Sequence, residues 1–202
     1  MIGLNLGQEI IDMFSSLGDL GMLLAITVII WIDGTAFPML PEAWLVFIFG
    51  AHPQSFAWAV ILVLVASCAS LLGNFTLYSF VKIAKPPGWI QRAMKKYTGW
   101  LVFKDERLLI LNRFAPLIPY TGAFMAVCDW NVRKCALYLS LSAVAKFSAY
   151  IVIFWFSFEN LEAQIAPWVS LGVVAAVIAA SVVSSIIYRK RQQTRRDPAR
   201  SQ

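Results

Sequence analysis

Four ionisable side chains stand inside otherwise apolar stretches of the sequence, at Asp33, Glu42, Arg113 and Lys146. Each would cost about 2.5–3.5 kcal/mol at the centre of a lipid-exposed helix. Together they would cost on the order of 10–14 kcal/mol, comparable to the unfolding free energy of a whole domain. They must therefore pair with one another or line a wet cavity. Two acids and two bases that meet in this way could bind an anion and exchange protons.

Three of these residues also have purely structural explanations. Glu42 could offset the dipole at the start of a helix. Arg113 could extend to the cytoplasmic interface, and Asp33 could form a turn before the glycine that follows it. Lys146 lies too deep in an apolar run to reach water easily, so it is the hardest of the four to explain by structure alone.

The composition places the chain among membrane proteins. Of its 202 residues 59% are apolar, and the formal net charge is +6. The first 19 residues carry acids and no Lys or Arg, so they lack the charged start of a cleaved signal peptide. The three cysteines lack metal-ligand spacing and are read as small buried residues. We expect no metal, no cofactor and no enzyme, since the single histidine is in a polar turn and no set of a nucleophile, a His and an acid is present.

Three apolar segments are long enough to cross a bilayer, namely 56–84, 135–156 and 168–188. Two others are broken in the middle. Residues 20–32 could form a helix of only about 20 Å, which is less than the roughly 30 Å hydrocarbon core. The stretch "RFAPLIPYTG" likewise divides its segment into two arms of about ten residues, each about 15 Å long.

Prolines and a glycine mark the middle of both broken segments. In such positions they end one half-helix and start another. The residues that we expect to break the two segments are Pro38, Pro41, Pro116, Pro119 and Gly122. Elsewhere, the Ala69-xxx-Gly73 spacing indicates close packing of two helices, and the Asn74-Phe-Thr sequon is attributed to chance because it lies inside a spanning segment.

The basic residues predict the topology. Residues 82–107 carry seven Lys or Arg, the tail from residue 189 carries six, and Arg133 and Lys134 follow the second broken segment. The first 19 residues, the "AHPQS" turn and residues 158–167 carry none. Because cytoplasmic loops are enriched in Lys and Arg, we expect a multi-pass cell-membrane protein with the N-terminus outside and the C-terminus in the cytoplasm.

These lengths and charges predict an all-α polytopic membrane protein. Its expected parts are two opposed re-entrant helical hairpins and about three spanning helices, related as an inverted repeat of the kind found in transporters. We expect an interfacial helix at 1–19, a membrane domain at 20–188 and a disordered basic tail at 189–202.

The hairpins would bring a ligand site to mid-membrane. Their second arms start at Glu42 and near Thr121, where free N–H groups point to the centre. Arg113 and Lys146 would add positive charge, so the site would suit a phosphate. Asp33 and Glu42 are the candidates for proton coupling, since burial raises the pKa of a carboxyl group.

Several motifs between Asp33 and Phe156 resemble the DedA family, whose shared region is also named the VTT or SNARE-associated domain. "DGTAFPMLPE" resembles the acidic, proline-containing first motif, and "ASLLGNFTLYSF" resembles the run in which Asn74 stands for a usual Asp. "NRFAPLIPYTGAFMA" resembles the Arg-Phe-x-Pro hairpin, and "DWNVRKCALYLSLSA" the stretch after it. The resemblance implies two opposed re-entrant hairpins among spanning helices.

The resemblance also implies movement of lipids between leaflets, with polyprenyl phosphate or aminophospholipids as substrates in prokaryotes and scrambling in eukaryotic relatives. Asp33, Glu42 and Arg113 match the positions of the family's acids and first arginine. The chain departs from the pattern where Glu42 follows Pro41 without a glycine. It also has Pro119 in place of a second arginine, a cation that Lys146 could replace.

The leading expectation is thus a flippase-like or scramblase-like transporter of phosphate-bearing lipids, with membrane lipids and protons as its partners, no nucleic acid, and a homo-oligomer as one option. Two alternatives stay open. One is a proton-coupled transporter of small solutes, cations or drugs, which would need an acidic cavity. The other is a membrane scaffold without transport, in which the charges only stabilise hairpin packing.

Overall fold

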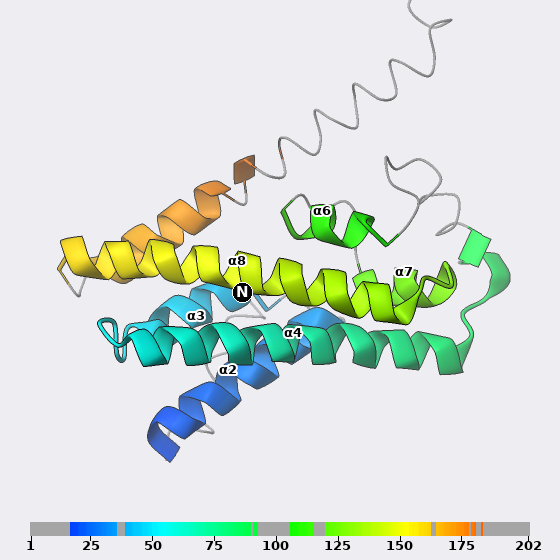
Figure 1. The fold of residues 1–202 in the computed structure, drawn as a ribbon, viewed down its shortest axis with the longest axis horizontal. Helices are drawn as coiled ribbons and strands as arrows, with labels where there is room; N and C mark the ends of the chain where they lie inside the picture. The colour runs from blue at the N-terminus through cyan, green and yellow to red at the C-terminus, as the bar shows by residue number, and fades with distance from the viewer. Residues whose placement is uncertain are drawn as a thin grey trace, which may run out of the picture.

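The computed structural model describes residues 17–35, 39–89, 91–92, 106–114, 120–162, 165–177, 179–180 and 183, with the side chains of 111, 113 and 114 left out. Within these residues every regular element is a helix (Figure 1). Three helices are long and apolar enough to cross a membrane, namely α2 (Gly18–Thr35), α4 (Phe56–Ala84) and α8 (Val132–Asn160). The expected all-α architecture, with helices of membrane-spanning length, is confirmed.

The identity of the third long helix differs from the prediction. Helix α4 matches the predicted segment, and α8 extends beyond 135–156 at both ends. The third is α2, whose 18 residues span about 27 Å because the helix continues through Asp33 and Gly34. The predicted span 168–188 begins within the shorter helix Ala166–Val177, and most of its remainder lies outside the described residues.

Some predictions concern residues that the structure does not describe. They are the interfacial helix at 1–19, apart from its last three residues, and the basic tail at 189–202. The breaking residues Pro38, Pro116 and Pro119 also lie outside the described ranges.

The long helices α4 and α8 have side-chain caps at their starts. Ser55 Oγ accepts a hydrogen bond from the backbone N–H of Trp58 at 3.2 Å. Asn131 Oδ1 accepts from the N–H groups of Arg133 at 3.1 Å and Lys134 at 3.3 Å. Such caps satisfy N–H groups that have no partner within the helix. The sequence therefore fixes where both long helices begin.

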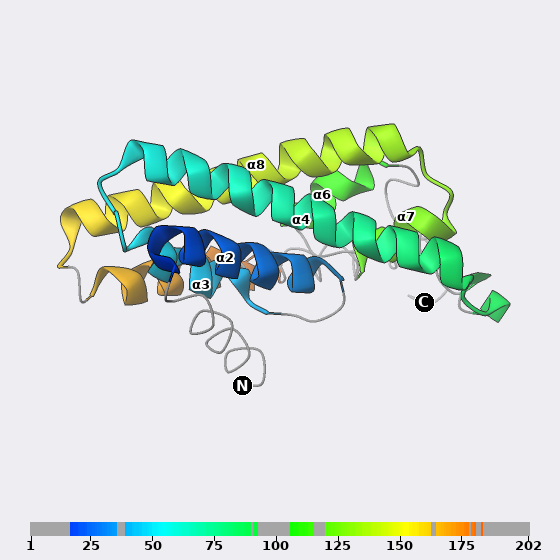
Figure 2. The same cartoon turned by 90° about the horizontal axis from the view of Figure 1, so that it is seen from below.

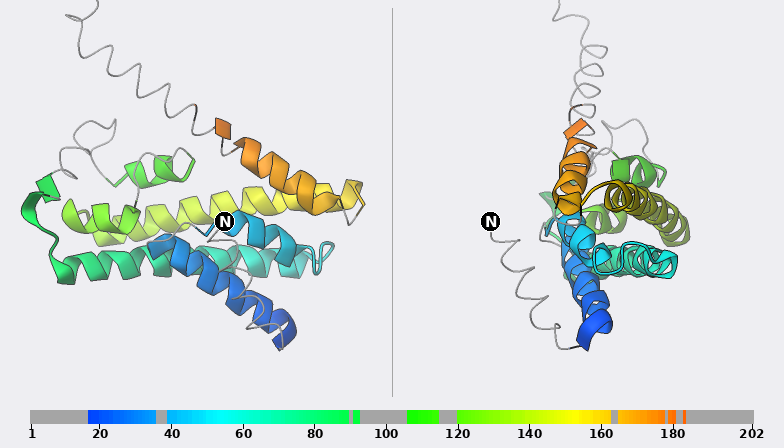
Figure 3. Two further views of the ribbon diagram at one scale, coloured as in Figure 1. Left: turned by 180° about the vertical axis from the view of Figure 1, so that it is seen from behind. Right: turned by 90° about the vertical axis from the view of Figure 1, so that its left-hand side faces the viewer.

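Helices α4 and α8 run antiparallel and side by side along the long axis of the molecule (Figure 1). They form one layer, and α2, α3 (Pro41–Phe49) and the helix Ala166–Val177 form a second (Figures 2 and 3). The short helix α3 lies near the end where α8 finishes, whereas α7 (Thr121–Val127) lies near the end where α8 begins (Figure 1). Helix α6 (Leu108–Phe114) packs on α8.

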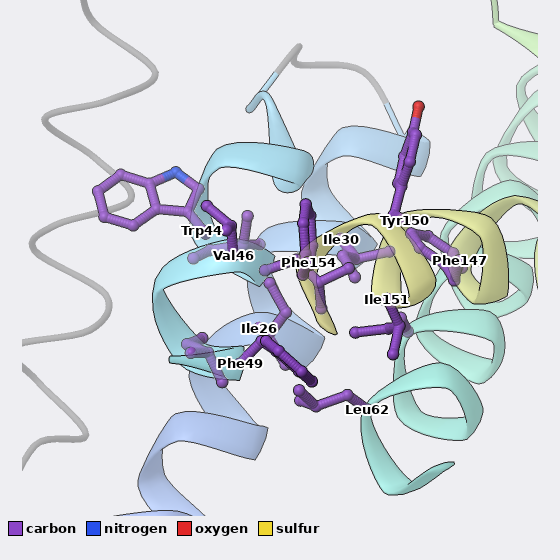
Figure 4. Packing of buried hydrophobic residues seen from close by; sticks show 14 of the residues in the cluster. Ile26, Ile30, Trp44, Val46, Phe49, Leu62, Phe147, Tyr150, Ile151 and Phe154 are labelled. Atoms are coloured by element: carbon purple, nitrogen blue, oxygen red, sulfur yellow. The ribbon is translucent and has the colours of Figure 1, made fainter. Parts of the chain in front are cut away.

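The main core lies where α2, α3, α4 and α8 meet. Figure 4 shows Ile26, Phe49, Leu62 and Phe154 pointing toward one another from these four helices. A second, smaller cluster joins α6, α7 and the start of α8 through Leu108, Leu109, Phe124, Met125, Trp130, Cys135 and Leu139. Lipid tails are as apolar as these side chains, so burial from lipid gives little driving force between helices. In a membrane, close packing of this kind therefore holds the helices together.

The two ends of each broken segment lie together. Asp19, in the first turn of α2, is hydrogen bonded at 3.0 Å to His52, in the turn after α3. Glu106, before α6, accepts a hydrogen bond at 2.9 Å from the backbone N–H of Asn131, after α7. His52 precedes α4, and Asn131 precedes α8. Because α4 and α8 are antiparallel, the two segments return to opposite ends of the bundle.

The two ends of the bundle differ in the charge of their side chains. Where α4 finishes and α8 begins, the chain places Lys82, Lys85, Arg107, Arg133 and Lys134. Lys82 forms an ion pair at 2.7 Å with Asp129, after α7. At the other end lie the acids Asp19, Glu159 and Glu162. One end of the described bundle is thus basic and the other acidic.

Candidate functional site

An ion pair joins Glu42, in the first turn of α3, to Lys146 on α8. Lys146 Nζ lies 2.7 Å from Glu42 Oε1, and the two side chains are only 19% and 11% exposed. The sequence predicts that the two acids converge with Arg113 and that Lys146 could join them, and the structure brings Lys146 and Glu42 together. A charge-assisted contact of this length between two largely buried side chains is much stronger than an exposed surface pair.

Lys146 occupies the middle of α8. It is 14 residues from Val132 and 14 from Asn160, so about 21 Å of helix extends on each side. Neither end of the helix is within reach of a lysine side chain. Its ammonium group also lies 5.7 Å from the Phe147 ring centroid and 5.5 Å from that of Tyr150, within the range of cation–π attraction.

Asp33 closes the break between α2 and α3. It lies in the last turn of α2, and its Oδ1 accepts a hydrogen bond at 3.0 Å from the backbone N–H of Met39. The alternative in which Asp33 forms a turn before Gly34 is wrong, because both residues continue the helix. The Asp33 side chain nevertheless fixes the backbone at Met39, three residues before Glu42. Asp33 as a whole residue is exposed.

The same backbone turn precedes the second arm of each broken segment. Leu40, before α3, has φ 49° and ψ 59°, and Tyr120, before α7, has φ 52° and ψ 58°. Residues other than glycine rarely adopt this left-handed conformation. Neither helix has a side-chain cap at this position. The two segments thus share a local conformation that 80 residues of sequence separate.

Both breaks meet on the middle of α4. Gly34 of α2 faces Gly73, where an added Cβ on Gly34 would lie 3.1 Å from the Gly73 Cα. A Cβ on Gly122, the second residue of α7, would collide with the backbone carbonyl oxygen of Asn74. Since two helices can approach this closely only where side chains are absent, these glycines determine where the broken segments converge.

Asn112 links the arms of the second segment. Its amide Nδ2 donates to Thr121 Oγ1 at 3.1 Å, from α6 to the first residue of α7. Thr121 was predicted to contact a ligand, and the structure gives it this structural role. Arg113 follows Asn112 in the last turn of α6, and its side chain lies outside the described residues, so its predicted convergence with Glu42 stays a prediction.

Sequence reasoning missed three contributors to this region. Asn74 was considered only as part of a chance sequon and as a departure from the family motif, but it is 6% exposed and its Nδ2 donates to the Ser70 carbonyl at 2.8 Å. The rings of Phe147 and Tyr150, beside Lys146, were not singled out either. The i+4 spacing of Tyr150 from the lysine is a signal that could have found its ring, whereas the i+1 spacing of Phe147 gives none. Among the described residues no group of His, Cys, Asp and Glu could hold a metal ion.

Comparison of the chain with protein-family models, with curated proteins and with solved structures gives no match. The resemblance to the DedA family, and the roles that it implies for individual residues, therefore stay predictions. The site itself is a largely buried acid–base pair at the centre of an apolar helical bundle.

Proposed function

We propose that this chain is a membrane transporter that moves phosphate-bearing lipids, such as polyprenyl phosphate or a phospholipid, between leaflets. The observation that carries the proposal is the Glu42–Lys146 ion pair, which has its lysine at the midpoint of a membrane-length helix. A charge at that depth is expensive and usually functional. A lipid headgroup that crosses the membrane needs a partner for its phosphate at the same depth.

The arrangement of the broken segments supports the proposal. In it, α2–α3 and α6–α7 are re-entrant hairpins that enter from opposite sides, as an inverted repeat requires. Helix α2, although about 27 Å long, then lies obliquely in the membrane, and the chain returns through α3 without crossing. The Asp19–His52 and Glu106–Asn131 contacts, which keep the two ends of each segment together, favour this arrangement. Irregular backbone at mid-membrane is tolerated only where protein or water covers it, and Gly34 and Gly122, in the helices beside the breaks, lie against the middle of α4.

In the proposed mechanism Lys146 exchanges partners. With Glu42 ionised, the carboxylate holds the ammonium group. When Glu42 takes up a proton it becomes neutral, and Lys146 is then available to the phosphate of a lipid. Release of the proton re-forms the pair and expels the headgroup. Asp33, at the adjacent break, is the second candidate for proton exchange.

The separation of charge supports a cell-membrane orientation. In the proposal the basic end, with Lys82, Arg107 and Arg133, faces the cytoplasm and the acidic end faces outward, in agreement with the enrichment of Lys and Arg in cytoplasmic loops. Hairpin α2–α3 then opens to the outside and α6–α7 to the cytoplasm.

A lipid-translocation assay in liposomes tests the proposal. Purified protein is reconstituted, and the movement of labelled polyprenyl phosphate and labelled phosphatidylethanolamine is followed with and without a pH difference. We expect at least one lipid to move faster than in protein-free liposomes, and Lys146→Met to abolish the gain. Glu159→Gln, at the exposed end of the same helix, is the matched control. If neither lipid moves faster with the wild-type protein, the lipid-transport proposal is wrong, and the small-solute transporter and the scaffold are the alternatives that stand.

A further inference from the structure

We propose that the end of α4 and the turn after it form a binding surface for anionic phospholipids of the adjacent leaflet, which stay bound there and are not transported. The residues of this surface, named here the anchor surface, are Phe80, Lys82, Ile83, Lys85, Trp89 and Arg92. The surface fits a headgroup that carries a phosphate and no amine, as in phosphatidylglycerol. The inference goes beyond the proposed function, because it holds whether or not the chain moves lipids.

Helix α4 is longer than the hydrocarbon layer that it would cross. Its 29 residues span about 43 Å, whereas the hydrocarbon core of a bilayer is about 30 Å thick. A centred helix therefore places about four residues at each end among the lipid headgroups. At the end of α4 these residues include Lys82 and Ile83, and Phe80 lies at the edge of the hydrocarbon.

A sharp turn keeps the rest of the anchor surface at the same depth. Lys85 ends α4 in the left-handed conformation, with φ 45° and ψ 79°, and the two prolines that follow cannot continue the helix hydrogen bonds. The chain therefore turns away from the axis of α4 (Figure 1). Arg92 Nε donates to the Gly88 carbonyl at 3.3 Å, which holds together the short segment that carries Trp89. Trp89 thus stays near the headgroups and does not extend far into water.

Three large apolar side chains of the anchor surface are exposed. The exposed fraction is 81% for Ile83, 68% for Trp89 and 67% for Phe80. Tryptophan is favoured at the boundary between membrane and water, because its ring is apolar and its N–H is polar. A soluble partner does not reach Phe80 at the edge of the hydrocarbon. The partner that fits these side chains is therefore the lipid itself.

The charged side chains of the anchor surface are all basic. Residues 80–92 contain no Asp or Glu. Lys82 forms an ion pair at 2.7 Å with Asp129, and Lys85 and Arg92 are exposed. The six basic and two acidic side chains among the described residues of this end are Lys82, Lys85, Arg92, Arg107, Arg133 and Lys134, with Glu106 and Asp129. The excess of positive charge attracts an anionic membrane surface.

This composition separates anionic from zwitterionic headgroups. A headgroup with phosphate alone meets the cations of Lys85 and Arg92, and a guanidinium can bind phosphate through two parallel hydrogen bonds. The amine of a zwitterionic headgroup finds no carboxylate within residues 80–92, and Asp129 already pairs with Lys82. The anchor surface should therefore prefer phosphatidylglycerol to phosphatidylcholine.

Thermal unfolding of the full chain in uncharged detergent micelles, with either lipid added, tests this preference. We expect phosphatidylglycerol to raise the unfolding midpoint by about 3 °C, since a ligand that binds only the folded state stabilises it. Phosphatidylcholine should leave the midpoint nearly unchanged. The rise should shrink in about 1 M salt, which shortens the screening length to about 3 Å. Glycerol phosphate, the soluble headgroup, should have no effect, which separates a lipid surface from a site for free phosphate.

Charge variants assign the effect to the anchor surface. Lys85→Gln combined with Arg92→Gln should lower the apparent affinity for phosphatidylglycerol about fivefold for each charge removed. Glu159→Gln combined with Glu162→Gln is the matched control, because it neutralises two exposed charges at the other end of the bundle. The control should leave the affinity unchanged.

Brominated lipids locate the bound headgroup, because bromine quenches only the tryptophans that it approaches closely. Brominated phosphatidylglycerol should quench the fluorescence of the wild-type protein more than brominated phosphatidylcholine does. This excess should be lost in Trp89→Phe, which keeps an aromatic ring but removes the indole.

Three results would overturn the proposal: equal midpoints with the two lipids, the same rise with glycerol phosphate, or an unchanged affinity in the variant without Lys85 and Arg92. Should that variant fail to fold, the quenching of the wild-type and Trp89→Phe proteins decides the matter, and equal excess quenching in both would contradict the proposal. None of these measurements follows lipid translocation, so a failure of the anchor surface and a failure of lipid transport are distinguishable.

Discussion

Lys146 Nζ and Glu42 Oε1 are 2.7 Å apart, although 104 residues separate them in the sequence. The contact joins the start of α3, next to the first break, to the midpoint of α8. Because both side chains are largely buried, removing one partner takes from the other a charged contact that water cannot readily replace. The pair is therefore the feature that links the stability of this fold to its proposed function.

The stability of the pair can be measured with a double-mutant cycle. Glu42→Gln and Lys146→Met should each lower the free energy of unfolding in detergent by about 2–3 kcal/mol, a little below the range for fully buried pairs because both side chains keep some exposure. The double variant should lose less than the sum, since it leaves no unpaired charge. Additive losses would mean that the two side chains do not interact in solution.

The close approach of α7 to α4 gives a second prediction. Gly122→Ala would place a Cβ against the backbone carbonyl of Asn74, so α7 must shift and the unfolding free energy should fall by about 1–3 kcal/mol. Gly172→Ala is the control, because an added Cβ there meets nothing within 4 Å. That helical glycine should gain about 0.5–1 kcal/mol as alanine. Thermal unfolding of both variants in detergent checks the pair of predictions, and equal midpoints would contradict the close contact.

The start of α8 predicts a dependence of stability on pH. The backbone N–H of Asn131 lowers the pKa of Glu106 from its ordinary value of 4.5, and the charges of Lys134 and Arg107 lower it further. A carboxyl group whose pKa is depressed by folding stabilises the fold above pH 4.5, and this contribution is lost as the pH falls through the folded-state pKa. Glu106→Gln should remove that part of the pH dependence of the unfolding midpoint. A midpoint that varies with pH identically in both proteins would exclude this contact as its source.

Thiol labelling in intact cells tests the proposed orientation. In a background without Cys68, Cys128 and Cys135, a membrane-impermeant reagent should label His52→Cys from outside. It should label Arg133→Cys only after the membrane is opened, because the basic end faces the cytoplasm. The opposite pattern would reverse the topology, and labelling of both sites from one side would exclude opposed hairpins.

Much of the fold could be predicted from the sequence because the cost of buried charge and the length of apolar segments are local properties. The helix Phe56–Ala84 and the core of α8 followed from apolar length. The need to neutralise buried charges indicated that Lys146 could join the acids, but it did not single out Glu42 as its partner. The full extent of α2 could not be predicted in this way. Asp33 and Gly34 are poor helix formers, but packing of Gly34 on Gly73 carries the helix through them.

The convergence of the breaks on Asn74 could not be read from the sequence either. A glycine pattern shows that some helix approaches closely, but it does not say which one. Gly73 was expected to mark close packing, and its partner proved to be Gly34. The left-handed conformations of Leu40 and Tyr120 could not be predicted from the sequence either. Neither residue type favours this conformation, and tertiary structure imposes it.

The measurement that tests the central claim most directly is the rate of phosphatidylethanolamine translocation in liposomes that contain the wild-type, Lys146→Met or Lys146→Arg protein. A mid-membrane cation that binds the lipid phosphate predicts that Lys146→Met moves lipid no faster than protein-free liposomes, while Lys146→Arg keeps measurable transport. Equal rates for the wild-type and Lys146→Met proteins, each folded and reconstituted to the same density, would contradict the account.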